Sequence, residues 1–175
     1  MTETEVTTYI SAAMADAVGS ELSRQVSYPI AESDIRKWAI ALYYPEPPPR
    51  LFWDADFART TAYGGVVAPE DFNPFAWMTA EPGGVQGPRS NDPQLTEKTL
   101  GLEPPGATFQ VNGSISVTYG QRMRPGDVIT SITRLGGYRE RTGRLGLMLF
   151  TTQDTTWTNQ DGELVRQSQG TVIRY

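Results

Sequence analysis

Residues 50–79 read RLFWDADFARTTAYGGVVAPEDFNPFAWMT and form the most apolar and aromatic stretch of the chain. A short apolar piece within it ends at Pro69, and two acidic residues then precede a run of apolar side chains. Proline at the first position of a helix loses no hydrogen bond, and acidic side chains in the first turn complement the helix dipole. The pattern therefore predicts a buried central helix after Pro69, either kinked at Pro74 or starting there with Asn73 as its N-cap.

The region before this stretch predicts a strand followed by a helix. Residues 23–30 are rich in β-branched and aromatic side chains, which suits a strand. After Ser33, a favourable N-cap, apolar residues recur at the spacing of one buried helix face, and the pattern ends before Pro45 because the residue preceding a proline avoids helical backbone. A shorter helix is expected after Asp54, which would cap it. The apolar face of the longer helix consists of Ile35, Trp38, Ala39 and Leu42.

From Ala107 onward the sequence alternates apolar with polar or small residues, as β-strands do. Turn signals at residues 124–127, 142–143 and 159–162 divide this region, and Gly136-Gly137 predicts a further break. The pattern predicts three or four antiparallel strands joined as a meander. Helices early in the chain and antiparallel strands late in it indicate an α+β fold, in which the sheet covers the central helix.

The chain has 175 residues, and we expect residues 1–175 to form a single domain. No linker separates two halves, and no repeat is visible. Residues 80–106 are rich in glycine and proline, which predicts a long loop inserted between the central helix and the strands. From its position after the central helix, this loop is expected to cover the mouth of a substrate site or to cross a partner.

Composition narrows the possible functions. The formal net charge of -5 and the scattered basic residues argue against a nucleic-acid partner. No apolar run could span a bilayer and the N-terminus is acidic, so we expect a cytoplasmic protein without a membrane partner. The chain contains no cysteine and no histidine, which removes Ser-His and Cys-His nucleophiles and nearly every zinc site. We expect no metal and no cofactor, and any chemistry must use other side chains, backbone amides or a partner's residues.

Three segments of the sequence, taken together, carry a family resemblance. They are SDIRKWAIALYY at 33–44, FWDADFARTTAYGGVVAP at 52–69 and VNGSISVTYGQRMRPGDVI at 111–129. They resemble the MaoC-like superfamily of hydratases and dehydratases, specifically its N-terminal-type domain, over roughly residues 20–175. The resemblance implies a hot-dog fold, an antiparallel sheet wrapped around a central helix. It also implies a protein that works in pairs of hot-dog units, with an acyl-CoA or acyl-carrier-protein thioester held at their junction.

The catalytic pair of the superfamily is missing from this chain. Active members carry an aspartate and a histidine just before a helix of the D-x-x-F-A type. Aligning residues 54–58 with that helix places Pro47 at the aspartate position and Phe52 at the histidine position. Members without the pair are typically the non-catalytic half of a heteromer, as in mycobacterial fatty-acid dehydratases and steroid side-chain hydratases.

The resemblance therefore implies an accessory subunit that shapes the acyl pocket of an enoyl-thioester hydratase or 3-hydroxyacyl-thioester dehydratase. Its partner, in a heterodimer or heterotetramer, would be a MaoC-like hot-dog subunit that supplies both catalytic groups. For the aromatic residues Phe52 and Trp53, burial in the core is the more common role, and a wall of the acyl pocket is the functional alternative. The substrate-binding residues expected in this chain are Phe52, Trp53, Val67, Ala68, Phe72, Phe75, Asn112 and Gly113.

Two other functions stay open at this point. One is a homodimer that binds acyl thioesters without chemistry. The other is a carboxylate-dependent hot-dog thioesterase or isomerase, in which Glu70 or Asp71 acts beside the amides of the central helix. Ordinary stabilisation of a helix start explains both acids as well. Arg122 and Arg124 are interpreted as solvated turn residues, with contact to a CoA phosphate as the alternative.

Overall fold

The computed structural model describes residues 8–76, 78, 91–144 and 146–175. Within these residues, five antiparallel strands form one sheet in the order β1-β3-β4-β5-β2. The strands are β1 (Glu21–Val26), β2 (Gln110–Tyr119), β3 (Thr130–Gly143), β4 (Gly146–Thr158) and β5 (Leu164–Arg174). The helices of the described residues are α1 (Ala12–Asp16), α2 (Glu32–Tyr43), the 3₁₀-helix η1 (Arg50–Phe52), α3 (Ala55–Arg59) and α4 (Leu95–Thr99). None of these helices is long and apolar enough to cross a membrane.

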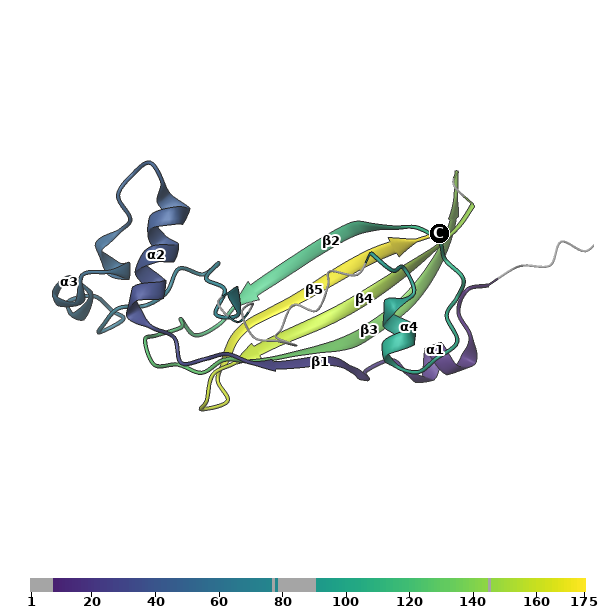
Figure 1. Ribbon diagram of the computed structural model, residues 1–175, viewed down its shortest axis with the longest axis horizontal. Coiled ribbons are helices and arrows are strands. Elements are labelled where there is room, and N and C mark those ends of the chain that lie inside the picture. The colour runs from purple at the N-terminus through teal and green to yellow at the C-terminus, as the bar shows by residue number, and fades with distance from the viewer. Residues whose placement is uncertain (1–7, 77, 79–90, 145) are drawn as a thin grey trace, which may run out of the picture.

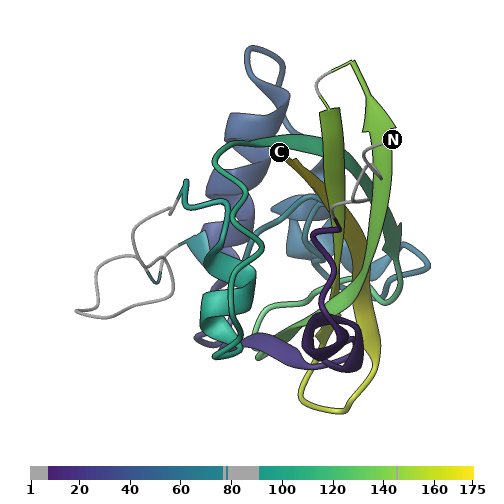
Figure 2. The same ribbon diagram turned by 90° about the vertical axis from the view of Figure 1, so that its right-hand side faces the viewer.

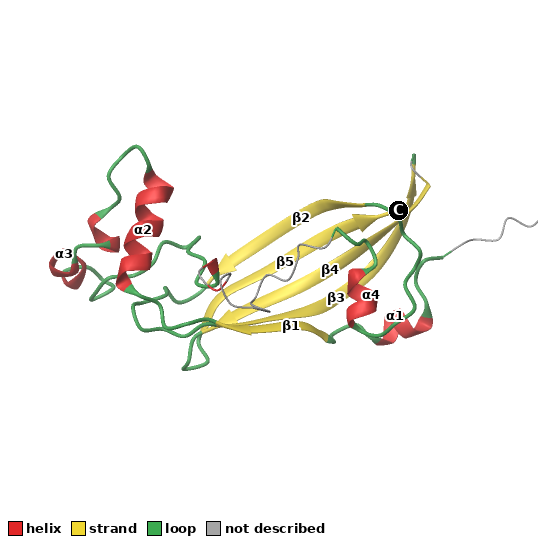
Figure 3. Cartoon of the chain, in the orientation of Figure 1, coloured by secondary structure: helices red, strands yellow, loops and turns green. Residues whose placement is uncertain are grey.

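The helices gather at the two ends of the sheet (Figure 3). Figure 1 shows α2 and α3 beyond one end of the sheet and α4 near the other end. Figure 2 shows α4 beside one face of the sheet. We call this face the inner face. The inner face includes Thr151 and Gln153 of β4 and Arg174 of β5, because these side chains contact α4, the residues just before it or one another.

The connectivity differs from the predicted meander at its first strand. β3, β4 and β5 are sequential neighbours, but β2 pairs with β5 and β1 pairs with β3. Residues 120–129 carry the chain from one edge of the sheet toward the other. Two backbone hydrogen bonds with Ile30 hold this connection near the start of α2. Ile30 N donates to Asp127 O at 2.9 Å, and Gly126 N donates to Ile30 O at 2.8 Å.

The predicted break at Gly136-Gly137 was wrong. β3 continues through both residues to Gly143, with a register shift between Leu135 and Gly137 that marks a β-bulge. A Cβ atom at Gly136 would lie 2.6 Å from Oδ2 of Asp154 on the neighbouring strand. The glycine therefore leaves room for the side chain of Asp154 and does not end a strand.

The two predicted helix starts have different outcomes. α2 begins at Glu32, one residue before the expected cap, and Ala31 at its N-cap makes no side-chain hydrogen bond. Acidic side chains in the first turn of α2 stabilise this start through the helix dipole. The cap of α3 is confirmed, because the carboxylate of Asp54 accepts a hydrogen bond from Phe57 N at 3.0 Å.

The hydrophobic core lies at the α2 end of the sheet and takes half of its residues from the apolar stretch at 50–79. The central segment after Pro69 packs there as a helical turn. Asn73 Oδ1 accepts a hydrogen bond from Phe75 N at 3.0 Å, so Asn73 caps the turn that Pro74 begins. A long helix is not formed over the described part of this segment, and Trp77 and Thr79 lie outside the described residues. The core consists of Ile30, Ile35, Ala39, Phe52, Ala58, Val66, Ala68, Phe72, Phe75, Met78, Met123, Ile129, Trp157 and Val165.

Candidate functional site

The two positions expected to carry the catalytic pair hold no titratable group. Phe52 closes η1 and is only 5% exposed, with its ring 5.9 Å from that of Tyr43. Pro47 lies exposed in the proline-rich loop before η1. Trp53, next to Phe52, is on the surface, where its indole donates a hydrogen bond to Pro48 O at 3.0 Å. The chain itself thus fills the expected histidine position with a packed aromatic ring.

The other apolar candidates of the central segment are core residues. Val67, Ala68, Phe72 and Phe75 are all at most 5% exposed. The ring of Phe72 meets Trp38 edge-to-face at 5.6 Å, and the ring of Phe75 meets Trp157 in the same way at 5.2 Å. Burial of a large apolar side chain stabilises a fold by about 1.5–3 kcal/mol. These four residues therefore have a sufficient structural role within this chain.

Glu70 and Asp71 are exposed and engaged in pairs with side chains of the sheet end. Glu70 lies 3.4 Å from a guanidinium nitrogen of Arg122, and Asp71 accepts a hydrogen bond of 2.6 Å from the hydroxyl of Tyr119. That hydrogen bond raises the pKa of Tyr119. Among the described residues that follow these acids, the amides of Phe72, Phe75 and Ala76 already donate hydrogen bonds within the chain, so they are not free to polarise a thioester carbonyl. The geometry gives the carboxylate interpretation no support.

The two arginines of the turn before β3 hold the backbone of the central segment. Arg122 is partly buried and donates to Ala68 O at 3.2 Å, and Arg124 donates to Tyr63 O at 2.8 Å. The interpretation of these residues as merely solvated was therefore incomplete. Guanidinium groups serve well here because they present several donors in a fixed plane.

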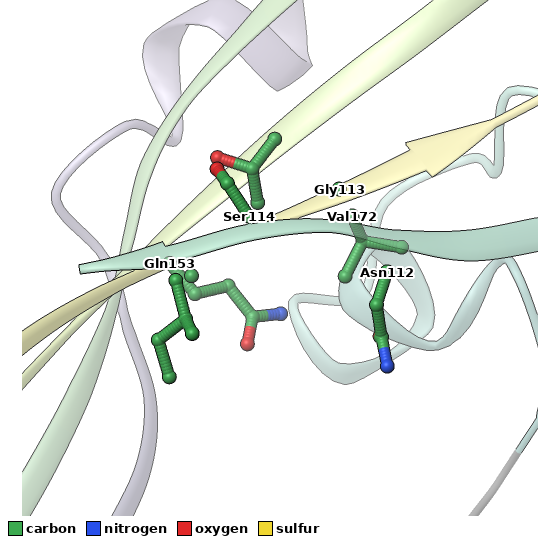
Figure 4. Close-up of a pocket in the computed structure, with 8 residues that line it drawn as sticks. Asn112, Gly113, Ser114, Gln153 and Val172 are labelled. Carbon is green, nitrogen blue, oxygen red and sulfur yellow. The ribbon is translucent and has the colours of Figure 1, made fainter.

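Asn112 and Gly113 line a cavity of about 420 Å³ over β2, β5 and β4 (Figure 4). The strand register puts Ile115, Gly170 and Gln153 side by side across the three strands, and Asn112, Val172 and Thr151 in the next row. Cavities of this size and apolar character are typical of small-molecule sites. The full lining is Asn112, Gly113, Ser114, Ile115, Gln153, Gly170, Thr171 and Val172.

The sequence indicated two of these residues and missed the contributions of β4 and β5. The available signal was Gly170, a glycine in the interior of a predicted strand, which often marks a bulge or a close approach. The structure also separates the candidates: Asn112 and Gly113 belong to the cavity on the sheet, whereas Phe52, Phe72 and Phe75 belong to the core at the α2 end.

A buried ionic cluster closes one end of this region. Glu97 of α4 is 0% exposed and Arg174 of β5 is 2% exposed, and two hydrogen bonds of 2.7 and 2.8 Å join them. Tyr138 donates to Glu97 at 2.7 Å, and Thr151 is hydrogen-bonded to Arg174. Burial on its own raises the pKa of Glu97, but hydrogen bonds from Arg174 and Tyr138 outweigh it and the net pKa is lowered. Because Glu97 and Arg174 are 77 positions apart, no local pattern could indicate this pair.

Comparison with known proteins assigns the chain to a family. Residues 16–168 match the family model described as FAS1-like, dehydratase domain region. The chain belongs to this family. No curated protein sequence matches the chain.

The structure of this FAS1-like dehydratase region is similar to solved structures of MaoC-like proteins, which confirms the predicted hot-dog fold and resemblance. The ChsH1-ChsH2 complex from Mycobacterium tuberculosis is 21% identical, with a TM-score of 0.66 over 94% of this chain and 88% of that one. A MaoC-like dehydratase from Rhodospirillum rubrum is 21% identical, with a TM-score of 0.54 over 91% and 92%. The (R)-hydratase from A. caviae is 18% identical, with a TM-score of 0.52 over 89% and 94%.

In the described part of this FAS1-like dehydratase region, the shifted pKa values of the carboxyl groups are all below their ordinary values. Among the described residues, every carboxyl group with a shifted pKa has that pKa lowered, which favours the charged form. A general acid needs the opposite shift, since it must hold its proton near neutral pH. The groups concerned are Glu21, Asp54, Asp92 and Glu97.

Proposed function

We propose that this chain is the non-catalytic subunit of a heteromeric enoyl-thioester hydratase or 3-hydroxyacyl-thioester dehydratase. Addition or removal of water across the α,β double bond requires a group that takes a proton and a group that gives one. The chain contains no histidine, and Phe52, at the position expected for one, is buried in the core. This observation carries the proposal, because a member of a dehydratase family that has no histidine needs a partner subunit to supply that group if it takes part in the reaction.

The edge of the sheet offers a surface for that partner. β2 is an edge strand of the sheet, and seven of its ten residues are exposed. Val111 is 40% exposed and Ile115 is 69% exposed, although both are apolar. A long edge strand of this kind is a template for pairing with another strand. The similar ChsH1-ChsH2 structure is itself a complex of two named subunits. The proposed partner is a MaoC-like hot-dog subunit that carries the aspartate and the histidine.

In this proposal the cavity over β2, β5 and β4 receives part of the acyl chain of a CoA or carrier-protein thioester. Asn112 and Gly113, two of the residues expected to bind substrate, line that space. The aromatic residues Phe52, Phe72 and Phe75 support the site from the core and do not line the cavity. Their contribution is to hold the α2 end of the chain in shape.

Co-expression with a MaoC-like subunit that carries the catalytic pair tests the proposal. The purified chain alone is expected to leave crotonyl-CoA unhydrated, whereas the co-purified complex hydrates it. Replacing the partner's histidine with alanine should abolish the activity of the complex, because this chain has no group to substitute for it. Substantial hydration of crotonyl-CoA by the lone chain would contradict the proposal.

A second candidate is a homodimer that binds acyl thioesters without chemistry. The same exposed β2 edge favours it, because two copies related by a two-fold axis can pair through one strand. Light scattering of the purified chain separates the candidates: a stable dimer that fails to bind any catalytic subunit supports the second one. The carboxylate-dependent thioesterase makes a different prediction, loss of thioester hydrolysis on replacing Glu70 and Asp71 with alanine.

A further inference from the structure

Among the described residues, side chains on the inner face of β5 are engaged at both ends of the strand, and a hollow lies between them. At one end Arg174 is tied to α4 through Glu97. At the other end the guanidinium of Arg166 lies over the ring of Trp157 at 4.6 Å, and Trp157 in turn packs against Phe75 of the core. Alternate residues of a strand share a face. The row on the inner face of β5 is Arg166, Ser168, Gly170, Val172 and Arg174, with Gly170 at its centre.

Nothing in the described part of the chain requires a glycine at position 170. Its φ angle is not in the left-handed region, and a Cβ atom added to it would meet no heavy atom of the described residues within 4 Å. Glycine in a strand interior weakens the strand through its conformational freedom and its missing side chain. By contrast, a Cβ atom added to Gly113 or Gly136 would come within 3.1 or 2.6 Å of a neighbouring atom. The gap at Gly170 therefore removes a side chain that the fold itself would accommodate.

That gap forms the floor of the cavity. Ile115 and Gln153 flank Gly170 on the two neighbouring strands, and Val172 lies next along β5. The amide of Gln153 lies 3.4 Å from the hydroxyl of Thr96 in α4, which draws its polar end toward the helix. The exposed lining is mostly apolar, so the space suits hydrocarbon better than a charged group.

α4 bounds the same space on one side. The distance along β5 from Gly170 to Arg174 is about 13 Å at the rise of a β-strand. Asp92, Leu95 and Thr96 form a second hollow with Gln153 and Val172, so the wall formed by α4 begins where the first cavity ends. The buried pair of Glu97 and Arg174 fixes this wall to the sheet.

We propose that Gly170 is a specificity-determining residue: its missing side chain makes room for the distal part of a long or bulky apolar acyl group. α4 limits how far that group extends. The inference rests on the proposed function, because it assigns the cavity to the acyl part of the thioester. It adds the substrate class, long or bulky acyl groups in preference to short ones, and the residue that selects them.

The test fills the gap with a side chain that suits a strand. The full chain, with its partner where one co-purifies, carries Gly170→Val or Gly170→Leu, and titration calorimetry gives the affinity for butyryl-CoA and dodecanoyl-CoA. The ratio of dodecanoyl to butyryl affinity is expected to fall at least about tenfold, because a branched side chain in a formed cavity excludes the longer chain. Gly170→Val should at the same time raise the melting temperature, since valine favours strands.

Gln167→Leu is the matched control. Gln167 is exposed on the opposite face of the same strand, so the added apolar group should leave the affinity ratio unchanged. A ratio that stays at the wild-type value in a folded Gly170→Val chain overturns the inference, as does a wild-type chain that prefers butyryl-CoA. Hydration of crotonyl-CoA by the same preparations reports on the proposed function separately, because the saturated thioesters measure binding alone.

Discussion

The buried carboxylate of Glu97 fixes α4, the helix that precedes β2 in the chain, to the sheet. Glu97 has no exposed surface and neutralises Arg174, which is almost as deeply buried. Removing one partner of such a pair leaves the other charge buried without compensation, which costs about 3–5 kcal/mol. Glu97→Ala is therefore expected to lower the free energy of unfolding by that amount in urea titrations. Glu21→Ala, which breaks an exposed pair with Arg24, serves as the control and should leave the melting temperature almost unchanged. Equal effects of the two substitutions would contradict the assigned role of Glu97.

The same carboxylate predicts a pH dependence of stability. The pKa of Glu97 is lower in the folded chain than its ordinary value of 4.5. A lowered pKa means that the unfolded chain takes up the proton more readily, so the stabilisation is complete above pH 4.5 and is lost as the pH falls toward the folded pKa. The difference in unfolding free energy between wild type and Glu97→Gln should therefore shrink as the pH is lowered below 4.5. A difference that stays constant through that range would show that the charge of Glu97 is not involved.

At the scale of elements, the cap signal at Asp54 was reliable, whereas the break predicted at Gly136-Gly137 and the predicted strand pairing were not. The cap of α3 by Asp54 depends on neighbours in sequence, and the structure has it as predicted. The pairing of β2 with β5 depends on the path of residues 120–129, about which alternation says nothing. The candidate site shows the same limit: Asn112 was expected from the family resemblance, whereas Gly170 lines the same cavity only because of the sheet register.

Two glycines of the sheet provide a prediction about strand contacts. A Cβ atom at Gly120, just after β2, would clash with the carbonyl oxygen of Leu164. Backbone cannot yield as a flexible side chain does, so Gly120→Ala is expected to destabilise the fold by at least about 1–3 kcal/mol. The Cβ atom of Gly170→Ala would meet no atom within 4 Å in the part of the chain that the structure describes, so this substitution should be neutral or stabilising. Guanidinium titrations of both variants check this, and an undiminished stability of Gly120→Ala would mean that the two chain segments lie further apart in solution.

At the scale of the whole molecule, the fold supplies an acyl-sized cavity and an open edge but, among the described residues, no Asp-His pair for proton transfer. The edge and the cavity share β2, since Ile115 is exposed at the edge and lines the cavity. A partner strand added to β2 would therefore lie next to the cavity. In the proposed heteromer this arrangement brings the partner's catalytic groups toward an acyl chain held on the inner face of this subunit.

Pairing through β2 can be tested with proline, which removes one backbone donor at a chosen side of the strand. Gly120 N donates to Val165 O at 2.9 Å, so Gly120 faces β5, and by alternation Ser116 faces β5 while Val117 faces the open edge. Val117→Pro should keep the melting temperature within a few degrees, because proline is tolerated on the outer side of an edge strand. It should weaken co-purification with the catalytic subunit at least about tenfold, since the lost donor and the rigid ring oppose an added strand.

Ser116→Pro is the matched comparison, because it removes a donor that faces β5 within the sheet. It should destabilise the isolated chain, which Val117→Pro does not. Undiminished assembly of the Val117→Pro chain would place the partner on another surface, and the cavity would then lack the catalytic groups beside it. The two prolines, one residue apart, thus separate the role of β2 in folding this subunit from its role in joining a second one.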